Sequence, residues 1–354
     1  MTRRVAVISG EDAAPEAMEA AVNLIDRMQL GIEWVFPLVG LPAEKKGLGF
    51  FPPEAKAQID AADATYFGAT SGPSAKALFY LRWGKGTYAN VRPTRWMPGL
   101  ASPLKNPASL DLVIVRENLE DAYVSIEGDL ANLAPLNIAS PTWRMKAHDL
   151  GPGRYAIKAI TEAGSERVIR FAFELARRRM SEGGRGKVTA SAKWNMLPKT
   201  DGLFVDVGRR IACEYPDITL ETLLVDDFAH RLVLDPGRFD VVVLPNLYGD
   251  ILSDAAAGLA GGLGLAPSGC YGEEYAYFES AHGTAPDIAG KGVINPTATL
   301  LSGAMMLEHL GFADAGRRLR SAIYSVYADG VILTPDQHGS ASTRAFCNAV
   351  FVEL

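Results

Sequence analysis

The sequence predicts an α/β protein with a mostly parallel sheet, divided into two domains. Strand patterns and helix patterns alternate from the N-terminus onward. The run VVVL at 241–244 is unbroken in its apolar residues, which is typical of a parallel strand buried on both faces. The length of 354 residues exceeds what a single hydrophobic core commonly supports, and this favours two domains.

The N-terminal segment reads as alternating strands and helices. Pro15 stands at the first position of a helix predicted over 15–28, where its fixed φ angle suits the helix. The predicted strands cover 4–9, 32–39, 64–69 and 87–93, a short helix starts at Pro52, and a further helix covers 76–83.

The composition changes after Pro93, where RWMPGLASPLKNPASLD is rich in proline and turn-forming residues. Such a change marks the passage into a second domain. Residues 130–156 are polar, contain proline, and are expected to be irregular or arm-like. The predicted strands then cover 110–118 and 187–193, and the predicted helices cover 165–179 with Ser165 as N-cap, 201–215, a segment from Val225, 296–309, 313–328 and a segment after 340.

Charge and cysteine content exclude several classes of protein. The net charge of −6, with no basic stripe, argues against a nucleic-acid partner. Cys213, Cys270 and Cys347 are too few and too far apart for a disulfide framework or a zinc site, which favours a cytoplasmic protein. The N-terminal MTRRVAVISG reads as a first strand, not a signal peptide, and no window offers an apolar run long enough for a membrane span.

Asp250 and Asp254 follow the apolar run at 241–244 and are spaced to share one face of a helix. Two like charges so close favour a cation between them, and a hard divalent ion such as Mg²⁺ or Mn²⁺ suits oxygen ligands. The alternative is that two aspartates at a helix start merely interact with the helix dipole, and for an isolated pair this alternative is the stronger one. Asn246 and Gly249 are expected to form a turn before that helix.

Two glycine-containing stretches do not bind phosphate by themselves. The stretch 255–269 lacks the lysine and hydroxyl residue of a P-loop. GPGRYA at 151–156 matches a loose dinucleotide fingerprint but follows no predicted strand.

Seven stretches together resemble the β-decarboxylating dehydrogenases, the family of isocitrate, homoisocitrate, 3-isopropylmalate and tartrate dehydrogenases. They cover most of the chain from Tyr88 to the end. The stretches are YANVRP at 88, DLVIVREN at 111, SERVIRFAFELA at 165, LPKTDGLF at 197, LVDDFAHRLV at 224, NLYGDILSDAAAGLAGGLGLAPS at 246 and HGTAPDIAGKGVINPTA at 282.

The resemblance implies a substrate and metal site. Arg82, Arg92 and Arg116 resemble the three arginines that hold the carboxylates of a malate-type substrate, where a bidentate guanidinium is the suitable group. The resemblance also gives Asp226, Asp250 and Asp254 as ligands of Mg²⁺ or Mn²⁺. This third aspartate makes a metal site the preferred interpretation of the pair.

The catalytic groups are implied in the same way. Lys193 resembles the lysine that takes the hydroxyl proton, and Tyr123 resembles the tyrosine that protonates the enol carbon after decarboxylation. Asp226 is counted with them as a catalytic residue. Asn195 is expected to assist in substrate or nicotinamide contacts.

The loop HGTAPDIAG resembles the segment that lies along the adenosine of the cofactor. Asp287 would accept hydrogen bonds from the ribose hydroxyls and would repel a 2′-phosphate, so NAD is expected. The expected cofactor contacts are His282, Gly283, Thr284, Ala285, Asp287 and Asn295.

The fold implied by the resemblance is the isocitrate/isopropylmalate dehydrogenase-like two-domain fold with a central, mostly parallel sheet, not the usual Rossmann fold. Residues 1–95 and 258–354 would form the large cofactor-binding domain, and 96–257 a central domain with the dimer interface and an arm. A homodimer with shared active sites follows, in which Lys193 and Asp226 reach into the partner's site, and pairing into a tetramer stays open.

The sequence departs from the family pattern in two places. The opening turn, glycine-rich in relatives, is Gly10-Glu11-Asp12-Ala13-Ala14-Pro15-Glu16 here, so it must follow another path near the nicotinamide. The segment 70–82, which reads the variable substituent of the substrate, is shortened. Lys76 in this segment favours an anionic substituent, whereas Leu78 and Phe79 could partly serve an apolar one.

The sequence therefore predicts an NAD-dependent enzyme that requires Mg²⁺ or Mn²⁺ and oxidatively decarboxylates an isocitrate-like 3-substituted malate to a 2-oxo acid, CO₂ and NADH. Homoisocitrate, tartrate, 3-isopropylmalate or a specialised malate, for example one bearing a phosphonate, are alternative substrates. A catalytically silent regulatory paralogue and a plain binding protein for a metal-chelated acid are rivals, but the lysine, the tyrosine and the three aspartates are all present.

Overall fold

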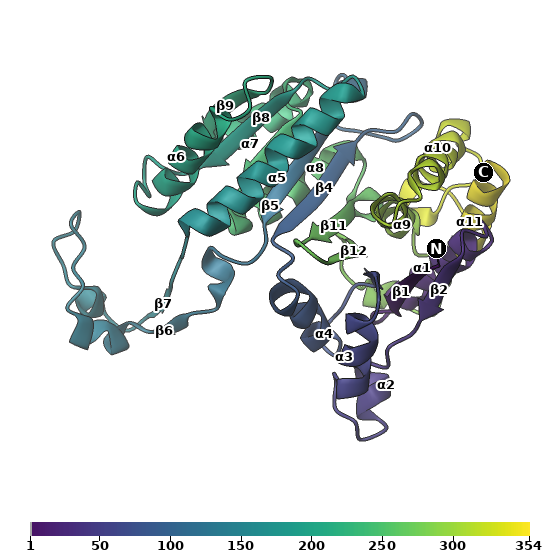
Figure 1. Ribbon diagram of the computed structural model, residues 1–354, viewed down its shortest axis with the longest axis horizontal. Coiled ribbons are helices and arrows are strands. Elements are labelled where there is room, and N and C mark those ends of the chain that lie inside the picture. Colours follow the sequence, from purple (N-terminus) through teal and green to yellow (C-terminus); the bar gives the residue numbers. More distant parts are fainter. Residues whose placement is uncertain (1) are drawn as a thin grey trace.

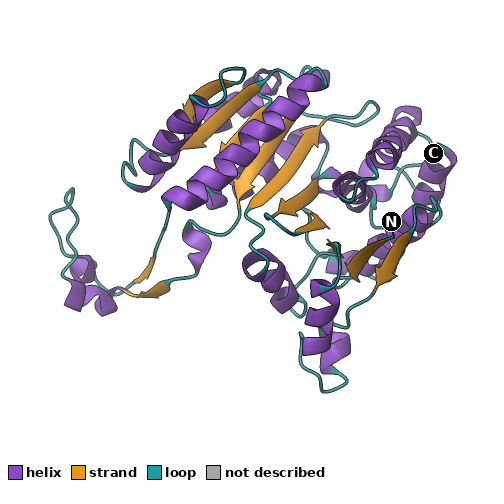
Figure 2. Cartoon of the chain, in the orientation of Figure 1, coloured by secondary structure: helices purple, strands orange, loops and turns teal. Residues whose placement is uncertain are grey.

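The computed structural model describes residues 2–354, and its largest element is one sheet of ten strands in the order β2-β1-β3-β12-β11-β4-β5-β10-β8-β9 (Figures 1 and 2). Its strands are β1 (Arg3–Ile8), β2 (Ile32–Val35), β3 (Ala64–Phe67), β4 (Ala89–Arg95), β5 (Asp111–Glu117), β8 (Lys187–Ala192), β9 (Thr219–Leu224), β10 (Val241–Leu244), β11 (Pro267–Tyr271) and β12 (Ala276–Ser280). Both outer parts of the sheet are parallel, and antiparallel pairs occur only where β12, β11, β4 and β5 meet in the middle. The predicted mostly parallel α/β sheet is confirmed.

Helices cover both faces of the sheet around β5 and β10 because the strand residues alternate between two cores. Val241 and Val243 pack in a core that includes residues of α5 (Glu162–Ser181) and α6 (Thr200–Ala212). Val242 and Leu244 pack on the opposite side with residues of α7 (Val225–Leu234) and α8 (Asn246–Ala260). The continuous apolar run at 241–244 thus reflects burial on both faces.

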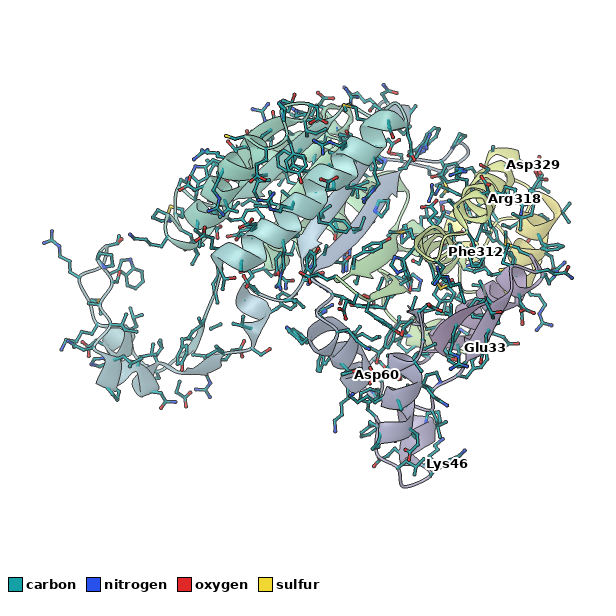
Figure 3. All side chains as sticks on the ribbon, in the orientation of Figure 1. Glu33, Lys46, Asp60, Phe312, Arg318 and Asp329 are labelled. Carbon is teal, nitrogen blue, oxygen red and sulfur yellow. The ribbon has the colours of Figure 1, made fainter. Side chains whose placement is uncertain are left out.

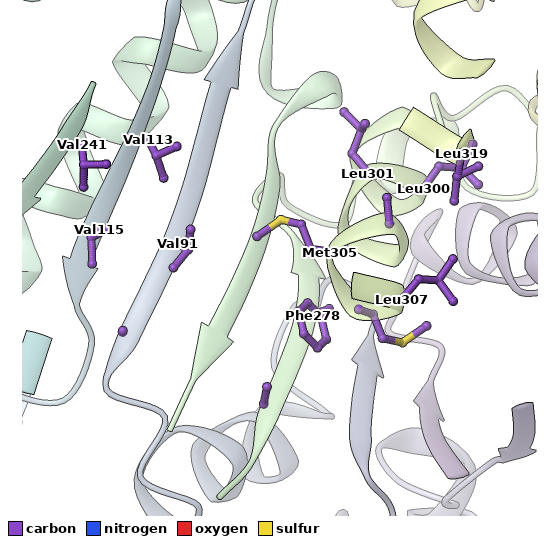
Figure 4. Close-up of a cluster of buried hydrophobic side chains, with 14 of the residues drawn as sticks. Val91, Val113, Val115, Val241, Phe278, Leu300, Leu301, Met305, Leu307 and Leu319 are labelled. Atoms are coloured by element: carbon purple, nitrogen blue, oxygen red, sulfur yellow. The ribbon is translucent and has the colours of Figure 1, made fainter. Parts of the chain in front are cut away.

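The other end of the sheet combines elements from both ends of the chain, and the two termini lie close together in Figure 1. Helix α1 (Ala14–Asp26) contacts α9 (Thr297–His309) and α11 (Thr343–Val352), and α10 (Ala313–Asp329) packs against α9. Figure 4 shows this core, in which Phe278 of β12 lies near Met305 and Leu307 of α9. The division into domains of 1–95 with 258–354 and of 96–257 stays a prediction.

The opposite face at that end carries shorter helices. Helix α3 (Pro53–Asp60) packs its Ala55 and Ile59 with Ile8 and Phe67 of the sheet. The remaining helices there are α2 (Leu41–Glu44) and α4 (Ala75–Phe79), the second of which continues into a π-helical turn at Tyr80–Gly84. Asp60, labelled in Figure 3, forms an ion pair with Lys85 at 2.6 Å. This ion pair connects α3 to the residue that follows the π-helical turn.

The segment between β5 and α5 forms an arm that extends away from the rest of the chain (Figures 1 and 3). It contains the two-stranded antiparallel sheet of β6 (Glu127–Asp129) and β7 (Arg154–Ala156). Apolar side chains are exposed along it, namely Ile126, Leu136, Ile138, Trp143, Met145, Leu150 and Ile157. The expected arm-like segment is therefore present, with more regular structure than its composition indicated.

Two predictions at helix starts are wrong. Helix α5 begins at Glu162, with Thr161 as its N-cap accepting a hydrogen bond from the backbone N–H of Gly164 at 2.9 Å. Ser165 lies inside the helix, where its hydroxyl donates to the carbonyl of Thr161. Helix α8 starts directly at Asn246, so Asn246 and Gly249 form its first turn and no separate turn precedes it.

The placement of α8 also removes one interpretation of the aspartate pair. No acidic residue lies in the first turn of α8, so Asp250 and Asp254 are not simply partners of its dipole. Gly249 allows the helix to approach β5 closely, because a Cβ there would lie 2.7 Å from Cβ of Arg116. Within residues 2–354, no helix combines the length and apolar character that crossing a membrane requires.

Candidate active site

A cluster of arginines and aspartates forms where β4, β5 and α8 meet. Arg92 projects from β4 and Arg116 from the adjacent antiparallel β5. The Arg92 guanidinium lies 2.9 Å from Oδ1 of Asp254 and donates to the hydroxyl of Ser253 at 2.8 Å. Its other terminal nitrogen lies 3.7 Å from Asp250. Arg92, one of the residues predicted to bind substrate, thus lies near both predicted metal ligands of α8.

Arg116 is almost fully buried within this cluster. It forms an ion pair with Asp250, and its Nε donates to Oδ1 of Asn246 at 2.8 Å. Burial, followed by the charge of Arg92, lowers the pKa of Arg116 to about 10, so the group remains a cation at neutral pH. A buried guanidinium held on one side by a carboxylate and an amide is rigid.

Tyr123 completes the cluster from the short helical turn at Ala122–Val124. Its hydroxyl donates to Oδ2 of Asp250 at 2.7 Å, and its ring lies 5.1 Å from the Arg116 guanidinium. Partial burial and the hydrogen bond to Asp250 raise the pKa of Tyr123, so the phenol stays protonated at neutral pH.

Arg82 reaches the same region from the π-helical turn after α4. Burial alone lowers the pKa of its guanidinium, but the neighbouring Tyr277 and Glu279 raise that pKa on balance. The Nε atoms of Arg82 and Arg92 are enclosed and have no hydrogen-bond partner among residues 2–354. The three predicted substrate arginines therefore lie close enough to interact electrostatically.

Glu279 is a charged residue of this cluster that the sequence reasoning missed. It lies at the end of β12, and burial raises the pKa of its carboxyl while Arg82, Arg92 and Arg116 lower it. The signal that could have revealed it is a glutamate in an otherwise apolar strand, AYFES, three positions before His282.

The donor set of α8 fits a divalent cation. Asp250 and Asp254 present carboxylate oxygens from adjacent turns, and Asp254 is 46% exposed. Burial and the like charge of Asp250 raise the pKa of Asp254 although Arg92 opposes this. A hard cation with oxygen ligands would relieve that repulsion. Among residues 2–354, however, no three His, Cys, Asp or Glu side chains are grouped so that they could hold a metal ion.

Lys193 and Asp226 form a separate pair. Lys193 follows the last residue of β8, and its Nζ lies 2.7 Å from Oδ1 of Asp226 at the start of α7. The hydrogen bond from Lys193 lowers the pKa of Asp226. Asp226 is 64% exposed, and Asn195 is exposed beside the pair. Within one chain, the predicted lysine and third aspartate are thus joined to each other but not to Asp250.

The predicted cofactor loop follows β12. Nδ1 of His282 lies 2.8 Å from the carbonyl of Gly283, and Nε2 of His282 is enclosed without a partner in residues 2–354. Burial lowers the pKa of His282, so the neutral imidazole is favoured. Gly283 and Asp287 are exposed, Thr284 is buried, and Ala285 has a positive φ of 49°. An enclosed imidazole nitrogen without a partner and an exposed carboxylate fit an adenosine, which offers ring and ribose hydrogen-bonding groups.

Asn295 is buried next to this loop. Its amide donates to Asp336 at 2.9 Å and to the hydroxyl of Tyr327 at 3.1 Å, and its carbonyl accepts from the backbone of Thr297. The Asn295 side chain, predicted to contact the cofactor, therefore already has hydrogen-bond partners for its amide nitrogen and its carbonyl within the chain.

The altered N-terminal turn connects the cofactor loop to the segment that carries Lys76. Gly10 and Asp12 both take positive φ angles, 77° and 55°, so an aspartate adopts a conformation that favours glycine. The Glu16 carboxylate accepts from the backbone N–H groups of Gly290 and Gly292. On the other side, Glu11 accepts hydrogen bonds from the backbone of Ser71 and from the hydroxyl of Ser74, the residue before α4.

Comparisons with known proteins find relatives that match nearly the whole chain. The family model described as "Isocitrate/isopropylmalate dehydrogenase" matches residues 4–350. The 3-isopropylmalate dehydrogenase of Archaeoglobus fulgidus is 39% identical over 98% of both chains. The isocitrate/homoisocitrate dehydrogenase of Thermus thermophilus is 40% identical over 100% of this chain and 99% of its own. The crystal structure of isocitrate dehydrogenase from Methylococcus capsulatus superposes with a TM-score of 0.84 at 36% identity, covering 99% of each chain.

Proposed function

The chain belongs to the isocitrate/isopropylmalate dehydrogenase family, and from this premise we propose that it oxidatively decarboxylates an isocitrate-like 3-substituted malate. It is an NAD-dependent decarboxylating dehydrogenase that uses Mg²⁺ or Mn²⁺. The products are a 2-oxo acid, CO₂ and NADH. Homoisocitrate, tartrate, 3-isopropylmalate and a specialised malate are the alternative substrates.

The observation that carries the proposal is the convergence of Arg92, Arg116 and Tyr123 on the carboxylates of Asp250 and Asp254. Arginine donors in a buried, fixed arrangement suit the carboxylates of a malate. The two aspartates would hold the divalent cation, which when bound draws electron density from the substrate oxygens. The Nε donor of Arg82 is enclosed and has no partner within residues 2–354, and Arg82 supplies the third guanidinium.

Lys193 is assigned the first proton transfer. As the C–H bond at the hydroxyl carbon of the substrate breaks, the neutral amine of Lys193 would take the hydroxyl proton, and NAD, when bound, would supply the acceptor for the hydride. Oδ1 of Asp226 lies 2.7 Å from Nζ and would orient this side chain. The lysine must first release the proton of that ion pair, because only the neutral amine can act as the base.

Tyr123 is assigned the last proton transfer. The bond from carbon 3 to its carboxylate then breaks, CO₂ leaves, and the electron pair forms an enol-type product. The phenol of Tyr123, kept protonated by its raised pKa, donates a proton to carbon 3 and gives the 2-oxo acid. Arg116, stacked on the tyrosine ring, fixes its position.

The substituent on the substrate is read by α4 in this proposal. Lys76 is exposed on this short helix, Leu78 is partly buried, and Phe79 is 52% exposed. An exposed ammonium favours a substituent that carries a third carboxylate, as in isocitrate, over the purely apolar group of 3-isopropylmalate. Phe79 is the observation that favours the apolar alternative.

The active site is shared between two chains in this proposal. Because Lys193 and Asp226 do not join Asp250 in one chain, a second copy would supply them. Exposed apolar side chains support an interface, because Met196 after β8, Val233 and Leu234 at the end of α7 and Ile251 on α8 are all exposed, and the arm exposes others. The unpaired cysteines are consistent with a cytoplasmic enzyme.

The test is a panel of acids incubated with NAD and Mn²⁺ and followed by the absorbance of NADH. Isocitrate, homoisocitrate, tartrate, 3-isopropylmalate and malate are compared with and without EDTA. We expect metal-dependent turnover that is highest with isocitrate or homoisocitrate. Binding of these acids without turnover on any of them would favour the regulatory paralogue or the binding protein and would refute the proposal.

A further inference from the structure

One lysine lies between two buried carboxylates that belong to no predicted site. Nζ of Lys158, at the base of the arm, lies 2.7 Å from Oδ1 of Asp201 and 3.2 Å from Oδ1 of Asp121. Neither aspartate is exposed, whereas Lys158 is 19% exposed. Its Nζ also lies 4.3 Å from the ring centre of Tyr248. A single ammonium therefore compensates two carboxylates that would otherwise be unpaired charges in the interior.

The first carboxylate holds the backbone of the predicted base. Oδ2 of Asp201 accepts a hydrogen bond from the backbone N–H of Lys193 at 2.7 Å. Asp201 lies in the first turn of α6, so this contact ties the end of β8 to the following helix. The position of Lys193 thus depends on where Asp201 is kept.

The second carboxylate holds the turn of the predicted acid. Oδ1 of Asp121 accepts from the backbone N–H of Ala122 at 2.8 Å, immediately before Tyr123. Oδ2 of Asp121 accepts from the backbone N–H of Leu247 at 2.9 Å, in the first turn of α8. One carboxylate thereby fixes both Tyr123 and the helix that presents Asp250.

Asp121 also has a strained backbone. Its φ of 69° and ψ of −143° lie in a region that residues other than glycine avoid. Paired backbone hydrogen bonds with Ala159, next to Lys158, help to maintain this conformation. Strain of this kind persists only where the surroundings enforce it, and it is concentrated at functional sites.

We propose that Lys158 is a positioning residue for the dehydrogenase reaction, because its bridge between Asp121 and Asp201 fixes the Tyr123 turn and the Lys193 backbone together. This inference rests on the proposed function for the roles of Tyr123 and Lys193. Lys158 itself touches neither of their side chains in the described contacts, so its effect is on geometry and not on chemistry.

The test compares Lys158→Met with Lys187→Met as a matched control. Lys187 is similarly buried, at 20% exposed, and is paired with Glu221 at 2.9 Å, but it stands at the opposite end of β8 from Lys193. We expect Lys158→Met to lower kcat on the order of 10-fold to 100-fold, because a small displacement of reacting groups reduces the rate by about that factor. The KM for NAD should change by less than about twofold. Lys187→Met should lower the melting temperature but leave kcat within about twofold of wild type.

Two further measurements keep the test decisive. Lys158→Met combined with Asp201→Asn removes one buried charge while the asparagine carbonyl can still accept from Lys193. If Lys158→Met does not fold, this double variant replaces it, and a kcat at the wild-type level would overturn the proposal. Hydrogen exchange can be measured without turnover. The backbone amides of segments 119–124 and 192–197 should exchange faster in the Lys158 variants than in wild type, and their exchange rates should be unchanged in Lys187→Met.

The outcomes separate this inference from the proposed function. A wild-type chain without turnover on any acid refutes the function, and the exchange measurement still decides about Lys158. If the wild-type chain shows turnover, the two lysine variants decide about Lys158. Equal losses of kcat in Lys158→Met and Lys187→Met, at equal melting temperatures, would refute only the positioning role.

Discussion

The hydroxyl of Tyr123 donates a 2.7 Å hydrogen bond to Oδ2 of Asp250, 127 positions further along the chain. The predicted acid and a predicted metal ligand are therefore in direct contact. Arg116 lies against both, since it forms an ion pair with Asp250 and lies over the ring of Tyr123. The side chains proposed for substrate binding, metal binding and proton donation, namely Arg116, Asp250 and Tyr123, are thus in mutual contact.

Replacing Tyr123 by phenylalanine should separate its chemistry from its packing. The ring over Arg116 is retained and only the proton is lost, so we expect kcat to fall by about 10²–10⁴-fold while KM for NAD stays near the wild-type value. Steady-state kinetics with the acid identified in the panel measures this.

The control for that variant is Tyr324→Phe, because Tyr324 lies over Arg95 at 5.6 Å in a comparable stacked pair outside the cluster. It should leave kcat unchanged. An equal kcat in the two variants would show that the Tyr123 side chain contributes only packing.

Asp254 gives a test of the metal site that does not depend on activity. Asp254→Asn removes one charged ligand but keeps a group that can accept from Arg92, so we expect Mn²⁺ affinity to fall on the order of 10-fold to 100-fold. Electron paramagnetic resonance of free Mn²⁺ measures the affinity directly. Asp206→Asn, at an exposed aspartate of α6 paired with Arg209, is the control. The same Mn²⁺ affinity in both variants would contradict the assignment of Asp254.

The fold was predictable from short-range patterns, and the residues of the candidate site could be selected from motifs. The four-residue spacing of Asp250 and Asp254 already placed them on one helix face, and the alternating elements indicated the sheet. The start of α5 was not predictable in this way, because Thr161 and Ser165 are both suitable caps. Glu120, 41 positions earlier, decides between them by accepting hydrogen bonds from the backbone and hydroxyl of Thr161.

The same limit explains the residues that were missed. Lys158, Asp121 and Asp201 come from three segments, and nothing in their local sequence indicates that they meet. Their contacts arise only when the arm base, the turn before Tyr123 and α6 pack together. Glu279 was missed for the same reason, because the three arginines that interact with its carboxylate lie on three other elements.

Glu117 should make stability depend on pH. This carboxyl is 2% exposed, and burial raises its pKa to about 7, although the backbone N–H groups of Glu120 and Leu119 oppose the shift. In the unfolded chain the group ionises near 4.5. The folded chain therefore binds the proton more tightly, and the contribution to stability is full below 4.5 and is lost as the pH rises through about 7.

Glu117→Gln cannot ionise and should escape that loss. Relative to wild type, the variant should gain about 2 kcal/mol between roughly pH 5 and pH 8, measured by urea unfolding at both values. Glu54→Gln, at an exposed glutamate of α3, controls for the loss of one negative charge. A difference between Glu117→Gln and wild type that does not change with pH would show that the carboxyl is not held in a proton-binding environment.

The shared site can be tested by combining two inactive variants. If Lys193 acts in the partner's site and Tyr123 in its own, a mixed dimer of Lys193→Ala and Tyr123→Phe chains contains one site with both groups intact. Random mixing makes half of the dimers mixed, each with one of two sites restored, so about a quarter of wild-type activity should appear after denaturation and refolding of an equal mixture. Each variant refolded alone is the control. If instead both groups acted in one chain, every site in the mixed dimers would lack one of them, and no activity would return. This measurement therefore decides whether Lys193 and Asp226 of one chain complete the site that contains Asp250 of the other.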